Sequence, residues 1–367
     1  MPVPQGSAGL ESSDPTPVID AHAHFFPTGI GSAPDSDPRW PRLEIDPDGS
    51  GWIVRGETPF RRVTASTWDV PARLRELSEG GIDRQVISPV PVTLVDWAEP
   101  AAARRFHGRQ NELIADAVAR SAGRLIGFGA VPLQDVAAAV DELERVTIEL
   151  DLAGIEIGTS PAGRELDDPA LSPFFAAAER LDVPLFVHPT QLPGVIRRHG
   201  QPDEFGLGML TDTAMAGSAL VFGGVLERHP GLRVLLAHGG GTLAWAFARM
   251  RWFAEQSDPG ATVRRFDQLL RRLWVDSIVF DPSQLALLVE RFGVDRLVLG
   301  TDHPFLPGYL PTARETLDRA VQDILHTAPD AAGVDGATLL GFLGIRPAPN
   351  RSAATYSEET SWQPLSN

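Results

Sequence analysis

The sequence predicts an α/β protein, a (β/α)8 TIM-like barrel with a small inserted flap after its first strand. Short apolar runs of strand length alternate with longer amphipathic stretches, which is the pattern of parallel strands joined by crossover helices. Eight such runs can be counted in the 367 residues. A barrel of this kind needs about 250 residues, so the surplus predicts insertions and tails around it.

The elements follow one another in regular order. The predicted strands are 18–21, 85–88, 126–131, 154–157, 185–188, 234–237, 273–276 and 297–301. The clearest helical stretches between them are 71–79, 101–120, 136–150 and 169–181. Several of these stretches open with Pro or Asp, which suit the first helical turn because its N–H groups lack partners and its dipole favours negative charge.

Two long connections break this order. Residues 28–66 are rich in Pro, Gly, Asp and Trp and exceed an ordinary loop. We expect a flap there, with strands at 51–55 and 60–63. Residues 191–208 form the second long connection. Both follow strands that carry candidate metal ligands, so both should overhang the site.

The chain is expected to divide into three parts. Residues 1–16 are Pro/Ser/Gly-rich and lack the pattern of a secretory signal, so we expect a flexible leader. Residues 17–346 form the barrel with its insertion, and 347–367 form a polar tail. No apolar run approaches the ~18–20 residues of a membrane span, so a cytoplasmic protein is expected.

Composition excludes several kinds of chemistry. The net charge of −16 argues against nucleic acid or an anionic membrane as a partner. The chain has no cysteine, which excludes disulfides and thiolate ligands. All 32 basic residues are arginine. The absence of lysine excludes Schiff bases and a carboxylated lysine bridging two metals, and it favours a mononuclear site.

Four residues form a candidate metal centre: His22, His24, His188 and Asp302. Each comes at or just after the C-terminal end of a predicted strand, where the active sites of barrels lie. His22 and His24 are two positions apart in extended chain, so their rings point to the same face. Three nitrogens and one oxygen suit one Zn2+ per chain with an open position for water. Mn2+ or Fe2+ would accept the same ligands.

Other polar residues are candidates for the surroundings of the metal. His238 precedes three glycines and could be a fifth ligand or, as we favour, a base beside the metal water. His303 either lines the pocket or bonds outward. Arg61, followed by Arg62, could hold a carboxylate through two parallel hydrogen bonds. The remaining histidines lie on helix or loop patterns and are expected to be solvated; they are His107, His199, His229 and His326.

Together these residues resemble the 2-amino-3-carboxymuconate-6-semialdehyde decarboxylase branch of the amidohydrolase superfamily, from about residue 18 to 344. The segments that carry the resemblance are 22–27 (HAHFFP), 68–69 (WD), 88–92 (SPVPV), 97–100 (WAEP), 154–159 (GIEIGT), 186–189 (FVHP), 237–241 (AHGGG) and 299–305 (LGTDHPF).

The resemblance implies a distorted barrel with one Zn2+ held by His22, His24, His188 and Asp302. It also implies that His238 orients the metal water and assists proton transfer. Arg61 falls where the family holds a substrate carboxylate. Homodimers are usual in the family, with an arginine reaching in from the neighbouring subunit. That position falls near Ser257 in this chain.

The chain departs from the family pattern around the expected pocket. Thr190 stands where the family has Trp, and His303 stands where it has Tyr. We expect Thr190, His303 and Trp97 to contact the substrate together with Arg61. The metal chemistry therefore transfers from the family better than the identity of the substrate does.

The predicted function is a metal-dependent, non-oxidative decarboxylase of a small unsaturated or aromatic carboxylate that carries an amino or hydroxy group. It would use a zinc-bound water, with His238 as proton shuttle and Asp302 as the second catalytic residue. The alternatives are a hydrolase of a lactone, amide or related ring, a hydratase of an unsaturated acid, and a binding protein with an inactive site. The first two need the same metal-bound water and base.

Overall fold

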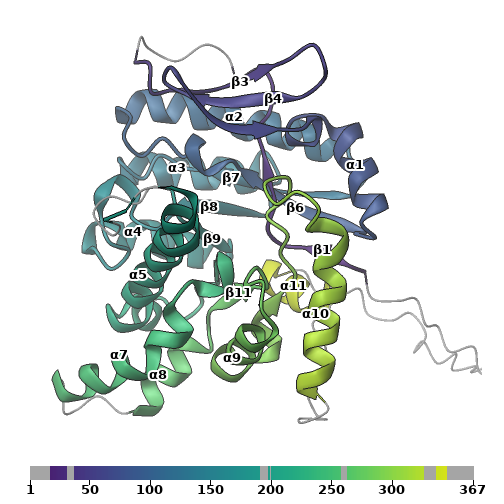
Figure 1. Cartoon of the computed structure of the whole chain (residues 1–367). Coiled ribbons are helices and arrows are strands. Elements are labelled where there is room, and N and C mark those ends of the chain that lie inside the picture. The colour runs from purple at the N-terminus through teal and green to yellow at the C-terminus, as the bar shows by residue number, and fades with distance from the viewer. Residues whose placement is uncertain are drawn as a thin grey trace, which may run out of the picture.

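The computed structural model describes residues 17–30, 37–190, 197–198, 200–257, 263–325 and 336–344. The predicted leader and tail lie outside the described residues. Eight parallel strands form the barrel wall (Figure 1). In order around it they are β1 (Ile19–Asp20), β6 (Arg84–Pro89), β7 (Leu125–Ala130), β8 (Gly154–Gly158), β9 (Leu185–His188), β10 (Val234–Leu236), β11 (Trp274–Asp276) and β12 (Leu297–Val298). The predicted barrel and its eight strands are confirmed.

The first and last strands nearly close the barrel. The Ala21 N–H donates to the Leu299 carbonyl at 2.8 Å, and Ala23 forms an isolated parallel bridge with His303. A short strand, β2 (His24–Phe25), continues the first strand and pairs with β6. The chain's N-terminal and C-terminal strands therefore meet at one point of the wall.

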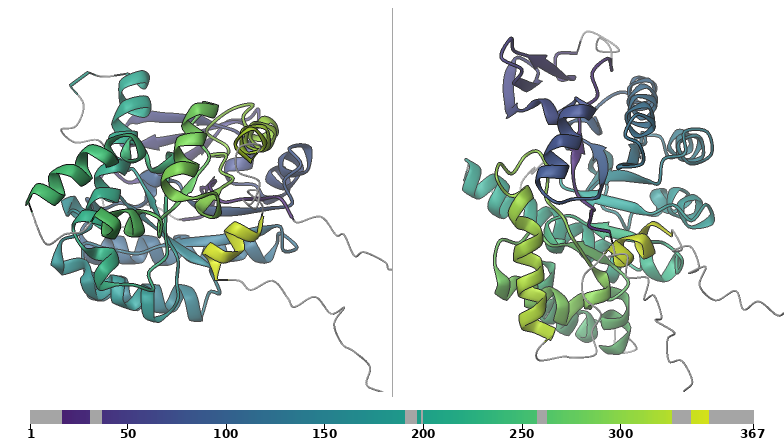
Figure 2. Two further views of the ribbon diagram at one scale, coloured as in Figure 1. Left: turned by 90° about the horizontal axis from the view of Figure 1, so that it is seen from below. Right: turned by 90° about the vertical axis from the view of Figure 1, so that its right-hand side faces the viewer.

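Helices surround the strands (Figures 1 and 2). They are α1 (Val70–Glu79), α2 (Pro100–Ala119), α3 (Val136–Ile148), α4 (Ser172–Arg180), α5 (Met209–Phe222), α6 (Val225–Arg228), α7 (Leu243–Ser257), α8 (Val263–Leu270), α9 (Pro282–Phe292), α10 (Leu310–Leu325) and α11 (Gly336–Leu343). Four start at a capping carboxylate that accepts a backbone N–H of the first turn, from Asp69, Glu99, Asp135 and Asp281. The predicted helices are present with ends shifted by a few residues.

Apolar side chains fill both sides of the barrel wall. One large cluster lies between the strands and the surrounding helices, and a second fills the barrel interior. Helix α11 closes the N-terminal end of the interior with Phe342, whose ring centroid lies 6.4 Å from that of Phe128 and 5.4 Å from that of Trp274. The barrel is thus a packed core, open for chemistry only at the C-terminal ends of its strands.

The insertion after the first strand is a separate antiparallel sheet (Figure 2). Its strands are β3 (Pro41–Ile45), β4 (Gly51–Arg55) and β5 (Thr58–Val63). The hairpin of β4 and β5 was predicted, but β3 was not. Strand β3 alternates apolar and polar residues, but it begins at a proline and is mostly exposed. A proline in such a run weakens the case for a strand in the sequence, although an exposed strand tolerates proline at its first residue.

Two expectations about surface histidines are wrong. His107 is fully buried and His229 is 6% exposed. His107 lies on the face of α2 that packs against the barrel, beside buried Phe106 and Asn111. Helix periodicity places it inward despite its polarity. His199 and His326 lie outside the described residues.

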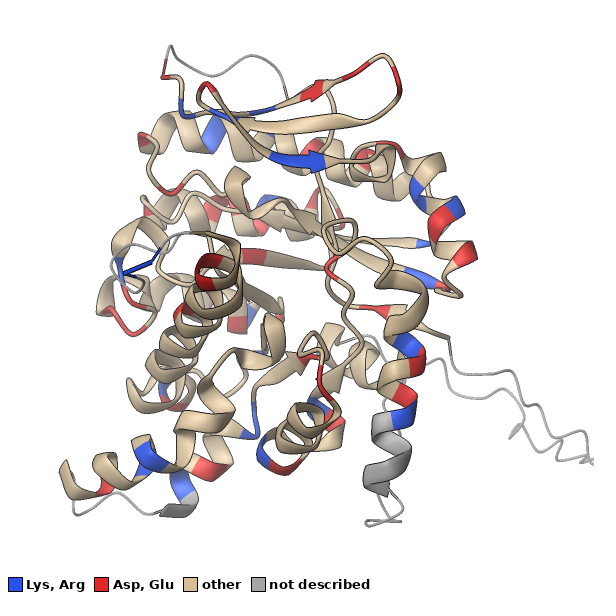
Figure 3. Ribbon diagram, in the orientation of Figure 1, with Lys and Arg blue, Asp and Glu red and all other residues tan. Residues whose placement is uncertain are grey.

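Among the described residues, one helical stretch, Pro202–Phe222, is long and apolar enough to cross a membrane on length and composition alone. Half of its apolar window is buried, and α5 within it packs on α6, α7 and β9. The length and hydropathy of this stretch differ from the expectation that no apolar run approaches membrane-spanning length. Acidic and basic residues occur side by side along the outer helices (Figure 3).

Candidate metal centre and cavity

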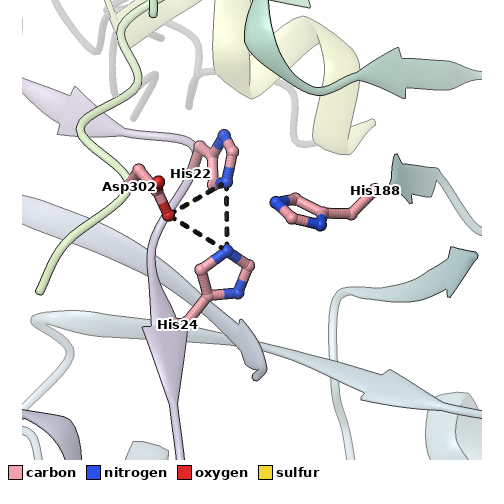
Figure 4. A group of neighbouring side chains, drawn as sticks. All are labelled: His22, His24, His188 and Asp302. Carbon is pink, nitrogen blue, oxygen red and sulfur yellow. Dashed lines mark hydrogen bonds and ion pairs between the residues drawn. The ribbon is translucent and has the colours of Figure 1, made fainter. Parts of the chain in front are cut away.

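The four predicted ligands meet at the C-terminal end of the barrel (Figure 4). His22 follows β1, His24 lies on β2, His188 ends β9, and Asp302 follows β12. One potential ligand atom from each lies within 4.8 Å of the others. Three of the four residues are buried, and the Asp302 side chain is 16% exposed.

Three of the four groups already have the spacing of a metal site. His22 Nε2 and His24 Nε2 are 3.1 Å apart. Asp302 Oδ1 lies 3.3 Å from His24 Nε2 and 3.7 Å from His22 Nε2. Tetrahedral bonds of 2.0–2.2 Å require ligand atoms about 3.3–3.6 Å apart. The observed distances fit a single first-row cation.

Each imidazole is oriented by a hydrogen bond from its other nitrogen. The Nδ1–H groups donate to Asp276 Oδ2 at 2.6 Å for His22, to the Pro89 carbonyl at 2.9 Å for His24, and to the Pro189 carbonyl at 2.8 Å for His188. The Nε2 atoms are therefore left to present lone pairs toward one another. His188 Nε2 is buried and has no partner in the described structure. Such a donor set fits a divalent cation, and outer contacts of this kind fix metal-bound histidines.

The carboxylates around the ligands stabilise positive charge at the centre, either as a proton on His22 or as a bound cation. Burial by itself would raise the pKa of Asp302, but the bond from His24 and the nearby imidazoles lower it to about 2. Burial lowers the pKa of His22, yet its bond to Asp276 and the surrounding carboxylates outweigh this and raise it. Burial also lowers the pKa of His188 well below its usual value, which keeps that ring neutral.

His238 lies beside the ligands but outside their group. Its ring centroid is 5.0 Å from that of His188 and 5.3 Å from that of His22. Its backbone has φ 55° and Asp302 has φ 54°, a left-handed conformation that is uncommon for non-glycine residues and in which His and Asp are enriched. Burial lowers the pKa of His238 to about 4, so the ring is neutral at pH 7.

The glycines after His238 allow this turn to approach helix α5 closely. A Cβ at Gly241, where φ is 61°, would lie 1.9 Å from the Leu210 carbonyl oxygen at the start of α5. Only glycine fits there. The turn is therefore held against α5, and it places His238 at the mouth of the barrel.

Asp276 contacts the candidate ligands although it is not among the residues predicted from the sequence. Its Oδ2 accepts the His22 ring at 2.6 Å and the His238 backbone N–H at 2.8 Å. Its Oδ1 accepts the backbone N–H groups of Gly239 and Ile278. Asp276 ends a predicted strand just as the ligands do, so the pattern that identified His188 and Asp302 could also have identified it.

A second group of buried polar residues that were not predicted from the sequence forms a hydrogen-bonded network next to the candidate ligands. Asp20 accepts hydrogen bonds from Thr301 Oγ1 at 2.6 Å and from Gln85 Nε2 at 2.7 Å. The buried Arg73 donates to Gln85 Oε1 at 2.6 Å and to the His24 carbonyl at 2.5 Å. Burial raises the pKa of Asp20 to about 6 and lowers that of Arg73 to about 9. This network ties the first strand to β6, α1 and the segment after β12.

A cavity of two lobes opens above the ligands. The lobes share five lining residues, which are Arg61, Phe205, Met209, His238 and Asp302. The inner lobe adds apolar walls from Val90, Val92 and Phe305 together with Thr190, and the outer lobe extends to Ile278, Phe280 and Gln284. Arg61 is the single arginine among the described residues that line them. The described part of the second long connection, with Phe205, overhangs the site.

Arg61 is held where β5 faces the barrel. Its Nη2 donates to the Phe305 carbonyl at 2.6 Å. Its guanidinium carbon lies 5.4 Å from the ring centroid of Phe205 and 5.5 Å from that of Phe305. Arg62 points the other way, is 46% exposed, and pairs with Asp46. The alternation of β5 thus sends one arginine to the cavity and the other to solvent.

The structure brings some predicted pocket residues together and leaves others apart. Thr190 lines the inner lobe with His188. Trp97 does not line either lobe; it packs on Trp40 at 5.0 Å, with Arg39 above its ring. His303 also lines neither lobe. Its Nε2 lies 2.6 Å from Glu76 Oε2, so the ring bonds outward and the expected substrate contact of His303 is wrong.

Comparisons with known proteins agree with this geometry. The amidohydrolase family profile matches residues 19–332. A 2-amino-3-carboxymuconate-6-semialdehyde decarboxylase of Dictyostelium discoideum is 32% identical, over 90% of this chain and 92% of its own length. A gamma-resorcylate decarboxylase of Rhodococcus jostii is 29% identical, over 64% and 76%. In the fold, the chain resembles a manganese-bound dihydroxybenzoic acid decarboxylase of Polaromonas sp. JS666, with a TM-score of 0.71, 21% identity, and coverage of 91% and 98%.

Proposed function

The chain belongs to the amidohydrolase family, in the branch that contains 2-amino-3-carboxymuconate-6-semialdehyde decarboxylase, and from that premise we propose a specific reaction. The protein is a metal-dependent, non-oxidative decarboxylase. Its substrate is a small unsaturated or aromatic carboxylate with an amino or hydroxy group. The observation that carries this proposal is the convergence of three oriented imidazoles and Asp302 beneath a largely apolar cavity with one arginine.

We propose that His22, His24, His188 and Asp302 hold one Zn2+. Mn2+ or Fe2+ would accept the same donors. When bound, such a cation acts as a Lewis acid toward substrate oxygens. The Nδ1 bonds of the three imidazoles support this assignment, because they leave the Nε2 lone pairs free for the metal.

The remaining steps belong to the chain's own residues. Arg61 binds a carboxylate, and the walls of the inner lobe hold the unsaturated system and exclude water. His238 is neutral in the free protein, so it can take a proton from the hydroxy or amino group of the substrate. His238 then delivers this proton to the carbon that bears the carboxylate, which interrupts the π system at that carbon. The carbon–carbon bond breaks to release CO2, and its electron pair restores the π system.

We also propose that residues 17–346 act as one catalytic unit in the cytoplasm and that two copies form a homodimer. The exposed face of α7 supports the dimer. Trp245 is 83% exposed, Trp252 54% and Phe253 49%, and large exposed apolar patches usually mark an interaction surface. Sedimentation velocity should give a dimer for the wild type and a monomer for Trp245→Glu. A monomeric wild type would contradict the proposal.

The reaction is tested by metal analysis together with a substrate panel. The purified protein is analysed for bound metal and incubated with hydroxy- and amino-arenecarboxylates and muconate semialdehydes while CO2 is measured. One metal per chain with CO2 release is the expected result. One bound metal per chain without CO2 release, but with hydrolysis of lactones or amides, would show that the protein is a hydrolase and not a decarboxylase.

A further inference from the structure

The outer lobe of the cavity leads away from the candidate ligands. It shares Arg61, His238 and Asp302 with the inner lobe, so one bound molecule can extend into both. The inner lobe, which also reaches His24 and His188, has a volume of about 70 Å³, whereas the outer lobe has about 460 Å³. The proposed chemistry at the ligands therefore uses the smaller lobe and leaves the larger one for a part of the substrate that does not react.

An exposed aromatic ring forms one wall of the outer lobe. Phe280 lines this lobe, and its backbone has φ 60°, which is an outlier for a bulky residue. The turn is fixed by the next residue, Asp281, which caps α9 by accepting the Ser283 N–H at 2.8 Å. The Phe280 ring remains 64% exposed, with its centroid 5.3 Å from that of Tyr309. The ring is thus held at the mouth of the lobe, where a ligand can reach it.

A helix that forms another wall begins with a π-helical turn. Residues Pro202–Gly208 have this rare conformation and continue into α5. Such turns are frequent at functional sites. Phe205 from this turn lines both lobes, and its ring centroid lies 5.4 Å from the guanidinium carbon of Arg61. Phe205 therefore borders the passage between the lobes, beside the arginine proposed to hold the carboxylate.

Beyond the residues that both lobes share, the outer lobe has an uncharged lining. Among the described residues that line this lobe alone, none is charged. Its polar side chains there are Gln201 and Gln284, which are both exposed, while Ile278 is buried. A charged group entering this part would lose hydration without gaining a counter-charge. An apolar group would gain by leaving water.

We propose that the outer lobe is a subsite for an uncharged aromatic substituent of the substrate. The inference rests on the proposed function and extends its substrate class. The unsaturated system that bears the carboxylate lies in the inner lobe, and a second ring lies in the outer lobe beside Phe280. Paired aromatic rings contribute more than the area they bury, so an aryl group is preferred over an alkyl group of similar size. Phe280 is a specificity-determining residue and takes no part in the reaction.

Unreactive probes measure the subsite apart from catalysis. In 2-nitrophenol the nitro group has the shape of a carboxylate but cannot leave as CO2. Derivatives carry a phenyl, cyclohexyl or carboxyphenyl group at each open ring position, and their affinity for the Zn2+-loaded protein is measured by isothermal titration calorimetry. At one position or more, we expect the phenyl group to tighten binding about tenfold relative to 2-nitrophenol. The cyclohexyl derivative should bind about threefold more weakly than the phenyl derivative, and the charged carboxyphenyl group should give no gain.

Three variants assign the gain to the ring at the mouth of the lobe. Phe280→Ala should reduce the phenyl gain about three- to tenfold, and Phe280→Tyr, which keeps the ring, should keep the gain. Ile148→Ala is the matched control, because it shortens an apolar side chain that is 70% exposed on α3 and lines neither lobe. Metal content and the affinity for 2-nitrophenol should be unchanged in all three. A merely structural role of Phe280 would weaken 2-nitrophenol and its phenyl derivative together.

Three results would overturn the subsite. They are a wild type without a phenyl gain at any ring position, a cyclohexyl derivative that binds as tightly as the phenyl derivative, and a Phe280→Ala variant that keeps the full gain. CO2 release from arenecarboxylates with and without a phenyl group is measured separately on the wild type. Decarboxylation without a phenyl gain refutes the subsite alone. A phenyl gain that depends on Phe280, without CO2 release from any carboxylate, refutes the reaction and leaves the subsite.

Discussion

At the residue scale, the proposed metal centre depends on the hydrogen bonds that orient its imidazoles as much as on the four candidate ligands. His22 could be predicted because two histidines at strand spacing are rarely placed together without a common partner. Its orientation could not, because Asp276 lies 254 positions away in the sequence. The same holds for Trp97 and His303, whose neighbours come from other segments of the fold. Spacing along the chain predicts which residues meet, but tertiary contacts decide where their polar atoms point.

Removing the one carboxylate ligand should empty the site. Asp302→Ala leaves three imidazoles, which lack the negative charge that attracts a divalent cation. We expect metal per chain to fall close to zero and CO2 release to stop, as measured by elemental analysis and activity. Glu165→Gln, which changes an exposed acid, serves as control. A variant with full metal and full activity would refute the ligand assignment.

Asp276→Asn tests the orienting contact. The amide is a weaker acceptor and can present an N–H to the His22 ring or to the backbone donors that now share the carboxylate. Loss of such outer contacts weakens metal binding about 10- to 100-fold. Competition with a chelator of known affinity measures the change. Affinity equal to that of the wild type would mean that the His22 ring is held by its packing alone.

At the element scale, the inserted sheet positions one side chain, that of Arg61, at the cavity. The sequence predicts its hairpin because β4 and β5 have strand-like residues on either side of a turn. It does not predict β3, which is largely exposed and adds width rather than core. For helix α2, the prediction for one residue is wrong in the opposite direction. Its polar His107 was expected at the surface, but the helix period places it against the barrel.

Neighbouring arginines on β5 provide a matched pair for the role of the sheet. Arg61→Ala should raise KM about 10- to 100-fold with a smaller change in kcat, since it removes a charge-assisted bond to the substrate carboxylate. Arg62→Ala should change neither, because this residue is exposed and its ion pair with Asp46 is screened by water. Steady-state kinetics on the best panel substrate distinguishes them. Equal effects of both substitutions would rule out a specific role for Arg61.

Buried His107 on α2 should make the unfolding free energy of the protein depend on pH. Burial lowers its pKa from 6.5 to about 4, so between these values the unfolded chain binds the proton more readily. The contribution of the neutral ring is complete above pH 6.5 and is lost as the pH falls toward 4. The difference in unfolding free energy between the wild type and His107→Gln should therefore narrow over this range, by up to about 1.4 kcal/mol per pH unit. Urea titrations at several pH values measure it, and a constant difference would contradict the prediction.

At the scale of the whole molecule, the barrel could be predicted because its parallel strands are buried on both faces and stand out as apolar runs. The closure of the barrel at its N-terminal end could not be predicted from the sequence. Helix α11 follows the last strand at some distance, and nothing in its short apolar sequence says that it enters the barrel interior. The packing of Phe342 against rings from two strands decides that position.

Shortening the Phe342 side chain of α11 should destabilise the entire barrel. Phe342→Ala is expected to cost about 3–5 kcal/mol in unfolding free energy, the range for a buried aromatic residue in a core. Leu340→Ala, at a partly buried position of the same helix, should cost less. Chemical denaturation followed by tryptophan fluorescence measures both, since Trp274 lies beside the Phe342 ring. Equal losses would mean that α11 covers the barrel without filling it.

The meeting of the first strand with the segment after the last has a consequence for biosynthesis. His22 and His24 leave the ribosome early, whereas Asp302 is made almost at the end of the barrel. At ordinary rates of translation the delay is on the order of tens of seconds. During this time the nascent chain holds imidazoles without their carboxylate. The proposed ligand set is therefore complete only after nearly the whole barrel has been made. A metal ion held by these four residues would require a chain in which the segment after the last strand has joined the first strand.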